Sequence, residues 1–428
     1  MEREIKDGVL YFDGCSTVEL AKKYGTPLYV YSESDISGRC RDIRESLNDK
    51  YPDTRAAYAA KAFFPMAMAK LMEKEGMCVD VVSGGELYTA LKAGFPAMKI
   101  EFNGNNKTPQ EIDLAVENHI GRMIIDSLQE LPMIEEACRK HDCKMKVLIR
   151  ITPGVMSSTH EYITTGKKDS KFGIPMDDDV IMPLVKQAID SKYVDFYGIH
   201  FHVGSQLFDN SSYLQALDVM LGLAKKIKEE YAYDVKELNV GGGFGVTYID
   251  EERKPYSYFI DPIMEKINSF YSEEMKGVKR PAVVIEPGRS MVAEAGLMLY
   301  TVGSIKDIKG IKKYVSIDGG MTDNIRPALY QALYTGIVAN KANKPKTDKV
   351  TICGKCCESG DILIKDIDIA KPEAGDIFAI FSVGAYGYSM ASNYNKNPIP
   401  GAIMVKNGKD RMIIKPQTYE NMISREIE

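Results

Sequence analysis

Residues 54–61 are Thr-Arg-Ala-Ala-Tyr-Ala-Ala-Lys, a short apolar run that ends in a lysine. This run is the first of eight strand candidates that alternate along the chain with helix-like segments. Most of the candidates are rich in Val, Ile and Phe, which is typical of strands buried on both faces of a parallel sheet. The eight candidates are Thr54–Lys61, Cys78–Ser83, Lys99–Asn103, Arg122–Ser127, Lys146–Ile151, Tyr197–Gly204, Glu237–Gly241 and Ala282–Glu286.

Several stretches between these strands carry apolar residues at helical spacing. Eight strands that alternate with helices predict a parallel (β/α)8 barrel, the TIM-like fold, over residues 36–292, which is close to the ~250 residues typical of that fold. A doubly wound sheet is the alternative, but it gives no reason for eight repeats. The helical stretches are Glu86–Ala93, Pro109–Glu117, Leu128–Arg139, Asp178–Asp190 and Tyr213–Tyr231.

The two ends of the chain predict a second domain that is mostly β, formed by residues 1–35 and 293–428. Short strand-like runs occur there between Gly and Pro residues, with few helical stretches. The expected fold class is therefore α/β plus all-β, with a barrel followed by a C-terminal β domain. The runs are Val9–Phe12, Leu28–Tyr31, Leu297–Ile305, Lys313–Ile317, Lys349–Ile352, Ile377–Phe381 and Ala402–Lys406.

Composition excludes several classes of protein. The 428 residues carry a net charge of -5, which argues against a nucleic-acid partner. No apolar run approaches the ~20 residues of a membrane helix, and the start has no signal-peptide core, so we expect no membrane partner and a cytoplasmic location. The 8 cysteines are spread over the whole length, which favours free thiols over a disulfide framework.

Lys61 is the first candidate for chemistry, because a charged group within an apolar stretch is costly unless it is paired or neutralised. Desolvation lowers the pKa of an ammonium, and a neutral amine can form an imine with a carbonyl compound. The alternative is a surface lysine whose stem lies along the protein with its head in water. This segment alone does not decide between the two.

The ends of the last two strand candidates predict a phosphate site. In such barrels phosphate often binds after strands 7 and 8, which here lead into Gly241–Gly245 and Glu286–Arg289. Glycines such as Gly243 and Gly288 let backbone N–H groups approach phosphate oxygens closely, and Arg289 adds charge. A simple tight turn at Gly241–Gly245 is the alternative. The pattern is not the G-x-G-x-x-G of dinucleotide-binding folds.

Three further residues complete this candidate site. Glu286 ends an apolar run and needs a partner, either a protonated pyridine nitrogen or a structural ion pair inside the barrel. His200 and His202 have the spacing of metal ligands, but no acidic or Cys partner accompanies them, so we expect no metal. His202 can instead cover the face of a flat ring, and Ser205 can donate to a phosphate.

Together these residues describe a phosphorylated pyridine held in a barrel, and pyridoxal 5'-phosphate fits each feature. Lys61 would form the imine, Glu286 would meet the ring nitrogen, and Gly243 with Ser205 would hold the phosphate. The chain resembles the fold-type III, or alanine-racemase-like, pyridoxal phosphate decarboxylases, and most of all their diaminopimelate-specific branch. The matching stretches are Tyr58–Ala62, Asp80–Glu86, Thr165–Gly173, Gly198–Ser205, Gly241–Gly243, Glu286–Arg289, Arg326–Tyr330, Cys357–Ser359 and Gly384–Tyr386.

The resemblance implies a head-to-tail homodimer with shared active sites, and it implies that Cys357 is the proton donor. A thiol suits that role, because it is small and can give up a proton. Family members often have Pro-x-Cys-Glu at this point, whereas this chain has Lys-Cys-Cys-Glu at 355–358, so Cys356 is an additional thiol. Cys353 and Cys356 form a C-x-x-C, but without a second pair a zinc site lacks ligands.

The resemblance also implies the substrate, meso-2,6-diaminopimelate, which would be decarboxylated to L-lysine and carbon dioxide in the last step of lysine biosynthesis. Its far end carries a carboxylate and an ammonium, and the chain offers groups of both signs. Arg289, Arg326 and Tyr330 suit the carboxylate, and Glu358 suits the ammonium.

Tyr386 is similarly placed by the resemblance to contact phosphate or substrate, and an ordinary aromatic residue of the β domain is the alternative. A decarboxylase of ornithine, lysine or arginine with the same fold is the alternative function. The long polar stretch Gly154–Lys171 is a candidate lid.

Overall fold

The computed structural model describes residues 3–155 and 170–427 of the chain. It divides the chain into two compact units. The barrel unit comprises Cys40–Gly245 and Arg253–Ser290, and the β unit comprises Met1–Arg39, Val246–Glu252 and Met291–Glu428. The short segment 246–252 thus belongs to the β unit although it follows a strand of the barrel unit.

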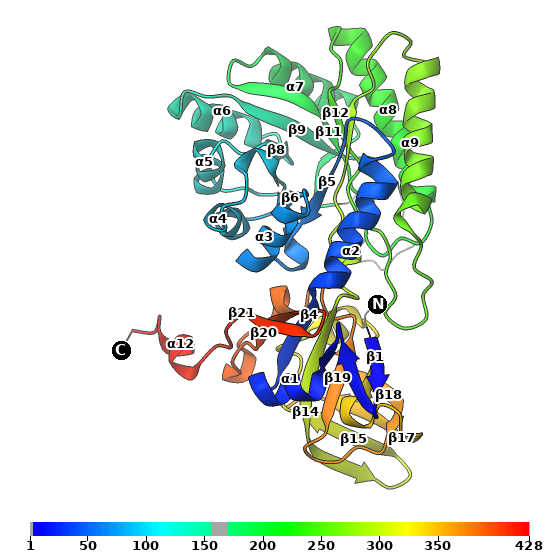
Figure 1. Ribbon diagram of the computed structural model, residues 1–428. Helices are drawn as coiled ribbons and strands as arrows, with labels where there is room; N and C mark the ends of the chain where they lie inside the picture. The colour runs from blue at the N-terminus through cyan, green and yellow to red at the C-terminus, as the bar shows by residue number, and fades with distance from the viewer. Residues whose placement is uncertain (1–2, 156–169, 428) are drawn as a thin grey trace. The chain divides into compact units, whose positions relative to one another are not determined.

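The barrel unit contains a closed sheet of parallel strands, as the sequence predicts (Figure 1). The sheet closes because β5 pairs with both β6 and β13, and β8 pairs with β9. Almost every residue of these strands is buried, which explains their continuous apolar runs. In sheet order the strands are β5 (Thr54–Ala59), β6 (Cys78–Val81), β7 (Ile100–Phe102), β8 (Arg122–Ile125), β9 (Met145–Thr152), β11 (Val194–His200), β12 (Glu237–Asn239) and β13 (Ala282–Ile285), with the short β10 (Ile174–Pro175) beside β9.

Helices surround the barrel strands (Figure 1) and begin where the sequence provides caps. Ser83 caps α4 by accepting from the Glu86 N–H, and Thr108 forms a capping box with Glu111 at the start of α5. All five helical stretches that the sequence predicts are confirmed, whereas α2, α3 and α9 were not predicted. The helices of this unit are α3 (Met66–Lys74), α4 (Gly84–Lys92), α5 (Pro109–Glu117), α6 (Glu130–Lys140), α7 (Asp178–Asp190), α8 (Ser211–Tyr231) and α9 (Tyr256–Glu273), and α2 (Glu33–Ile43) begins in the β unit and ends in the barrel unit.

The β unit is built around a mixed sheet in which the long strand β14 (Gly296–Ile308) pairs with three others. The N-terminal strand β4 (Leu28–Ser32) lies in this sheet between β14 and β20, so this part of the chain start belongs to the β unit. The remaining strands are β1 (Arg3–Lys6), β2 (Val9–Phe12), β3 (Cys15–Ser16), β15 (Lys312–Ile317), β16 (Gly336–Val338), β17 (Lys346–Cys353), β18 (Ile362–Ala370), β19 (Ile377–Phe381), β20 (Gly401–Lys406) and β21 (Lys409–Ile414).

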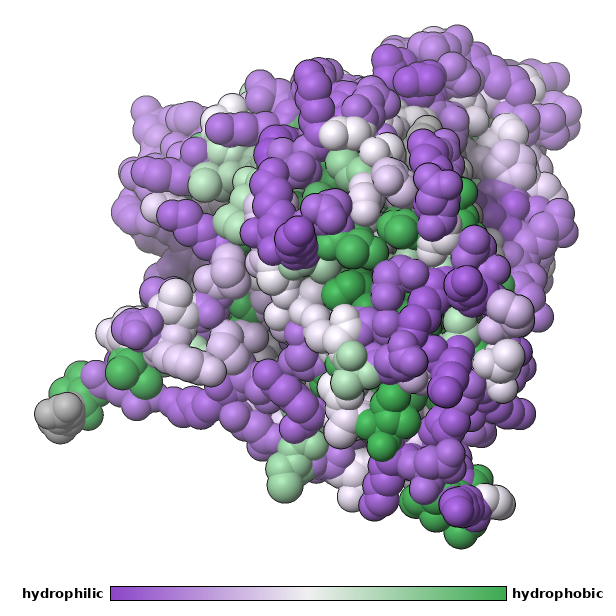
Figure 2. Space-filling model, turned by 60° about the horizontal axis from the view of Figure 1, so that its bottom comes forward, coloured by the Kyte–Doolittle hydropathy of each residue, from purple (hydrophilic) through white to green (hydrophobic). Residues whose placement is uncertain are grey.

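Short helices complete the β unit. They are α1 (Thr17–Tyr24), α11 (Arg326–Tyr330) and α12 (Tyr419–Ile423), and α10 (Arg289–Val292) follows the last barrel strand. The face of the molecule in Figure 2 is mostly hydrophilic, with hydrophobic residues in small groups. Among the described residues, no helix has the length and apolar character needed to cross a membrane.

Candidate active site

Lys61 lies in a single turn, Ala60–Ala62, that directly follows β5. Its side chain is exposed while Ala60 and Ala62 on either side are buried. Of the two alternatives for Lys61, the structure shows an exposed side chain, because the chain leaves the buried strand before this residue. The ammonium still acts electrostatically on groups inside the barrel, since it lowers the pKa of both Glu286 and His202.

The Lys61 turn is held against the loop that follows β13. The Ala59 N–H donates to the Pro287 carbonyl over 3.0 Å. A Cβ added at Gly288 would come within 2.9 Å of the Ala59 Cβ, closer than real Cβ atoms approach one another. Glycine at 288 is therefore what allows the loop carrying Glu286 to pack on the turn carrying Lys61.

Glu286 is buried at the end of β13 and has three partners from other strand ends. His200 Nε2 lies 3.1 Å from each of its carboxylate oxygens. Asn103 Nδ2 and Asn239 Nδ2 donate to Oε1 over 3.0 and 2.9 Å. The expectation that this carboxylate needs a partner is confirmed, and within the chain that partner is a histidine with two amides. The sequence alone indicates no role for His200 other than that of a candidate metal ligand.

Burial alone would raise the pKa of Glu286, but the protein lowers it to about 2. The opposing causes are attraction and hydrogen bonding from His200, with further attraction from Lys61 and His202. Glu286 is thus a buried carboxylate that stays ionised at neutral pH. Such a group can hold a cationic ring nitrogen.

A ladder of polar side chains leads from Glu286 into the barrel. Glu237 and Asn239 are two residues apart on β12 and therefore face the same side. Glu237 is fully buried and ion-paired with Arg55 and with Arg122, whose Nε lies 2.8 Å from Oε1. Asn239 donates to Glu101 over 3.2 Å and accepts from the Gly241 N–H over 2.9 Å. Asn239 thus connects Glu286 to the start of the glycine loop.

Glu101, on β7, has the opposite electrostatic behaviour to Glu286. Burial first, and then repulsion by Glu237, raise its pKa to about 8 despite the attraction of Arg55 and Arg122. At neutral pH this carboxyl group is therefore mostly protonated. Asn239 thus lies between the charged carboxylate of Glu286 and the neutral carboxyl group of Glu101.

Three predicted phosphate ligands lie together at the strand ends. Arg289 Nε donates to the Ser205 hydroxyl over 3.1 Å. The Leu207 N–H donates to the Gly243 carbonyl over 2.9 Å, so the loops after β11 and β12 run side by side. A Cβ at Gly243 would come within 2.2 Å of the Gly204 carbonyl oxygen, and φ there is +117°. Only glycine allows this approach, as the sequence pattern indicates.

His202 is a half-buried residue beside the glycine loop. Its Nδ1 accepts a hydrogen bond from the Gly242 N–H over 3.3 Å. Burial, together with repulsion by Lys61 and Arg150, holds its pKa well below the usual value. His202 is therefore a neutral imidazole at neutral pH, which suits stacking on a ring.

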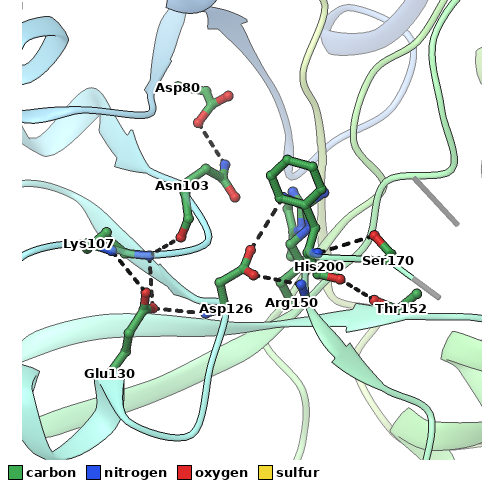
Figure 3. Close-up of polar contacts among 12 residues, drawn as sticks. Asp80, Asn103, Lys107, Asp126, Glu130, Arg150, Thr152, Ser170 and His200 are labelled. Atoms are coloured by element: carbon green, nitrogen blue, oxygen red, sulfur yellow. Dashed lines mark hydrogen bonds and ion pairs between the residues drawn. The ribbon is translucent and has the colours of Figure 1, made fainter. Parts of the chain in front are cut away.

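A second polar network occupies the ends of β7, β8 and β9 (Figure 3). Asn103 bridges Glu286 to Asp80 through its Nδ2, which lies 2.7 Å from the Asp80 Oδ1. Repulsion by Glu286 adds to burial and raises the pKa of Asp80 well above its usual value. Nearby, Lys107 and Glu130 form a buried ion pair of 2.9 Å, and Arg150 Nη1 lies 3.5 Å from Asp126.

In the β unit, Arg326 is a buried guanidinium at the start of α11, with only 6% of its surface exposed. Its Nη1 donates to the Tyr334 hydroxyl, and it lies over the rings of Tyr248 and Tyr334. Within the described residues, no carboxylate lies at ion-pairing distance from Arg326. Arg326 therefore does not belong to a surface ion pair, because it is buried and its partners are aromatic.

The neighbouring cysteines differ in their surroundings. Cys357 is exposed, and its N–H donates to Asn395 over 2.7 Å. Cys356 is half-buried, and burial together with Asp361 raises its pKa to about 11. The Asp361 carboxylate accepts from the Cys356 N–H over 2.8 Å. The structure therefore separates the two thiols and leaves Cys357 as the accessible one.

Three further predicted residues, Glu358, Tyr330 and Tyr386, belong to the β unit. Glu358 is exposed and accepts from the Gly360 N–H over 3.2 Å. Tyr330 is half-buried at the end of α11. Tyr386 is half-buried with φ at +61°, a left-handed conformation that non-glycine residues rarely adopt and that is often found at functional sites.

Two features named from the sequence lie largely outside the described residues. The proposed lid, Gly154–Lys171, and the first part of the stretch Thr165–Gly173 fall in residues 156–169. Phe172 and Gly173 are described. The Gly173 N–H donates to Asp126 over 2.6 Å, and Arg150 lies over the Phe172 ring at 4.7 Å.

Comparison with known proteins identifies the family. Residues 33–293 match the family model described as pyridoxal-dependent decarboxylase, pyridoxal binding domain. A diaminopimelate decarboxylase of Bacillus subtilis is 43% identical over 426 residues, covering 99% of this chain and 97% of that protein. The crystal structure of diaminopimelate decarboxylase from M. jannaschii in complex with L-lysine is 37% identical with a TM-score of 0.92, covering 100% of this chain and 98% of that one. The Helicobacter pylori enzyme complexed with L-lysine is 31% identical with a TM-score of 0.87, covering 95% of this chain and 98% of that one.

The chain therefore belongs to the pyridoxal-dependent decarboxylases, and within them to the diaminopimelate decarboxylase family. It is a carboxy-lyase, and its cofactor is pyridoxal 5'-phosphate.

The residues of the barrel unit fit this cofactor. Glu286 Oε1 accepts from three groups but Oε2 only from His200, so Oε2 can accept one further donor such as a protonated ring nitrogen. Within the described chain the Gly243 N–H donates to no group, which leaves it for a phosphate oxygen. Both features match what a pyridine phosphate requires.

Several residues that shape the site were not identified from the sequence. Asn103, Asn239 and Glu101 support Glu286 from inside the barrel, and Tyr248 and Tyr334 contact Arg326. The sequence does offer one signal, because Asn239 follows Glu237 at strand spacing directly before the glycine loop. No comparable signal marks the two tyrosines.

Proposed function

We propose that this enzyme decarboxylates meso-2,6-diaminopimelate to L-lysine and carbon dioxide, the last step of lysine biosynthesis. The observation that carries the proposal is Arg326. A buried guanidinium without a carboxylate partner in the described chain is costly unless a ligand supplies one. Diaminopimelate supplies a carboxylate at the end distant from the reacting carbon, and L-lysine bound in the two related structures retains that carboxylate.

In the proposed arrangement Lys61 would hold the aldehyde of the cofactor through its amine. Glu286 would hold the ring nitrogen, and His202 would cover the ring. Ser205, Gly243, Gly288, Arg289 and Tyr386 would bind the phosphate. When bound, pyridoxal phosphate accepts the electron pair that the leaving carboxylate gives up.

The remaining residues act on the substrate itself. Arg289, Arg326 and Tyr330, with Tyr386, would bind its distal carboxylate, and Glu358 would bind the distal ammonium. A guanidinium binds a planar carboxylate through two parallel hydrogen bonds, which fixes orientation as well as position. The Cys357 thiol would donate a proton to the carbon that has lost carbon dioxide.

Release of carbon dioxide from three substrates tests this function. We expect kcat/KM for meso-diaminopimelate to exceed that for L-lysine or L-ornithine by about 10⁴-fold, because those two leave the distal carboxylate site unfilled. Equal or better turnover of L-ornithine would overturn the assignment in favour of the ornithine, lysine and arginine decarboxylases. Wild-type holoenzyme serves for all three assays.

We also propose that the active enzyme is a homodimer in which Cys357 and Glu358 act in the site of the other subunit. Support comes from Cys357, which is exposed within its own chain, whereas a proton donor works best where water is excluded. A second copy of the chain can supply that cover.

Mixing two inactive variants tests the shared site. Lys61→Ala removes the amine and Cys357→Ala removes the thiol. After random reassociation half of the dimers contain one chain of each variant, and each of these dimers has one intact site. About 25% of wild-type activity is therefore expected to return. Variants carrying both substitutions, mixed with wild-type chains at the same ratio, control for subunit exchange. No recovery despite proven exchange would show that both residues act within one chain.

A further inference from the structure

Arg326 is surrounded by two tyrosines from different parts of the sequence. Its guanidinium carbon lies 4.9 Å from the ring centroid of Tyr248 and 5.6 Å from that of Tyr334. The two rings pack edge to face, with centroids 5.4 Å apart and an angle of 84° between their planes. Both tyrosines are buried, with 7% and 5% of their surface exposed.

Tyr334 also binds the guanidinium directly, because Arg326 Nη1 donates to its hydroxyl oxygen. Burial acts to lower the pKa of Arg326, and the neighbouring Tyr334 and Tyr248 raise it. The guanidinium also lies over the faces of both tyrosine rings, which attract a cation. These partners fix the guanidinium while leaving its charge without a carboxylate from the described chain.

Tyr248 is itself held in a defined position. It lies on the segment 246–252, which directly continues the glycine loop of the barrel unit. The backbone N–H groups of Tyr248 and Ile249 both donate to the Glu251 carboxylate over 2.9 Å. Ser382 donates to the Thr247 carbonyl over 3.1 Å, which ties the segment to the β unit. A turn braced in this way presents the Tyr248 ring in one orientation.

We propose that Tyr248 and Tyr334 are positioning residues that orient Arg326 for the distal carboxylate of the substrate. This inference rests on the proposed function, because it assumes that Arg326 binds that carboxylate. The reason for an aromatic clamp is electrostatic. A carboxylate partner from the protein would fix Arg326 equally well but would neutralise it, whereas tyrosines fix the side chain and preserve its charge for the ligand.

Two ligands that differ by one carboxylate test the clamp in the holoenzyme. L-lysine carries the carboxylate that remains after the reaction, and pentane-1,5-diamine is the same molecule without it. Tyr334→Phe keeps the ring and removes the hydroxyl. We expect it to weaken inhibition by L-lysine about 10-fold, because a hydrogen bond to a charged group is lost. Inhibition by pentane-1,5-diamine is expected to stay unchanged. Tyr248→Leu removes the stacked ring and should act in the same direction.

The controls separate this inference from the proposed function. Tyr300→Phe alters another buried tyrosine of the β unit, whose hydroxyl donates to the Met298 sulfur over 2.9 Å, and should change neither inhibition constant. Arg326→Ala should weaken inhibition by L-lysine and leave inhibition by pentane-1,5-diamine unchanged. If Arg326→Ala leaves L-lysine inhibition unchanged, the proposed role of Arg326 fails. The clamp is wrong, and Arg326 keeps its role, if Arg326→Ala weakens inhibition by L-lysine but neither tyrosine variant does. The same conclusion follows if the tyrosine variants weaken inhibition by L-lysine and by pentane-1,5-diamine equally.

Discussion

Replacing Lys61 by alanine is expected to lower kcat by about 10⁴-fold or more, the scale of loss when a residue that bonds covalently in the reaction is removed. The substitution removes the amine on the turn after β5. That amine lowers the pKa of both Glu286 and His202 by its charge. Because Lys61 is exposed, its loss creates no cavity, and the melting temperature of the apoenzyme should stay within about 2 °C of wild type. Carbon dioxide release and thermal unfolding measure the two effects.

Covalent labelling identifies the residue independently of activity. Treating wild-type holoenzyme with borohydride and mapping its peptides should place the pyridoxyl label on Lys61. Lys70→Ala is a matched control, since Lys70 is another exposed lysine of the barrel unit, on α3, and its removal should change neither the label nor kcat. A label on any other lysine, or full activity in Lys61→Ala, would contradict the central assignment.

The barrel could be predicted from the sequence because its strands are buried on both faces. Runs such as those of β8 and β9 are mostly apolar and almost wholly buried, and this signal is local. Helix α3, which is rich in Met and Ala, is not among the predicted helices although its buried and exposed faces differ as clearly as those of the predicted α4. Strand β18 was missed because charged residues interrupt its apolar pattern.

The site could be predicted from the sequence at positions where the residue type is required by the backbone or is unusual for a buried strand. Gly243 is needed because only glycine avoids the Gly204 carbonyl, and Glu286 stands out as a carboxylate at the end of a buried strand. The sequence leaves a buried and an exposed Lys61 equally open, because its exposure depends on how the chain turns after β5. The Tyr248 and Tyr334 contacts with Arg326 join residues 78 and 8 positions away, and such pairs carry no local signal.

Replacing Glu286 by glutamine is expected to lower kcat by about 100-fold, because a preorganised charge at the ring nitrogen is lost while the size of the side chain is kept. Glutamine can still bond to His200 and the two asparagines that surround this position, so the site should keep its shape. Steady-state kinetics at saturating cofactor measure the effect. Glu286→Asp, which retains the charge but shortens the side chain, should lose less. A glutamine variant as active as wild type would show that the charge is not needed.

The pH dependence of stability gives this prediction a second, sharper test. The pKa of Glu286 is depressed to about 2 in the folded chain from an ordinary value of 4.5, so its ionisation stabilises the fold above pH 4.5 and this contribution is lost as pH falls toward 2. Glu286→Gln should therefore lower the melting temperature at pH 7, and its melting temperature should approach that of wild type only near pH 2.

Glu101 provides a control in the same barrel, because its pKa is shifted in the opposite direction to that of Glu286. Its pKa is raised from 4.5 to about 8, so the folded chain holds a proton that the unfolded chain releases, and stability falls as pH rises from 4.5 to 8. Glu101→Gln removes that cost while still accepting from Asn239, so its melting temperature relative to wild type should rise over this range. If the melting temperatures of both variants, relative to wild type, change in the same direction with pH, then Glu286 and Glu101 are not the charged and the neutral carboxyl group that the polar ladder assigns to them.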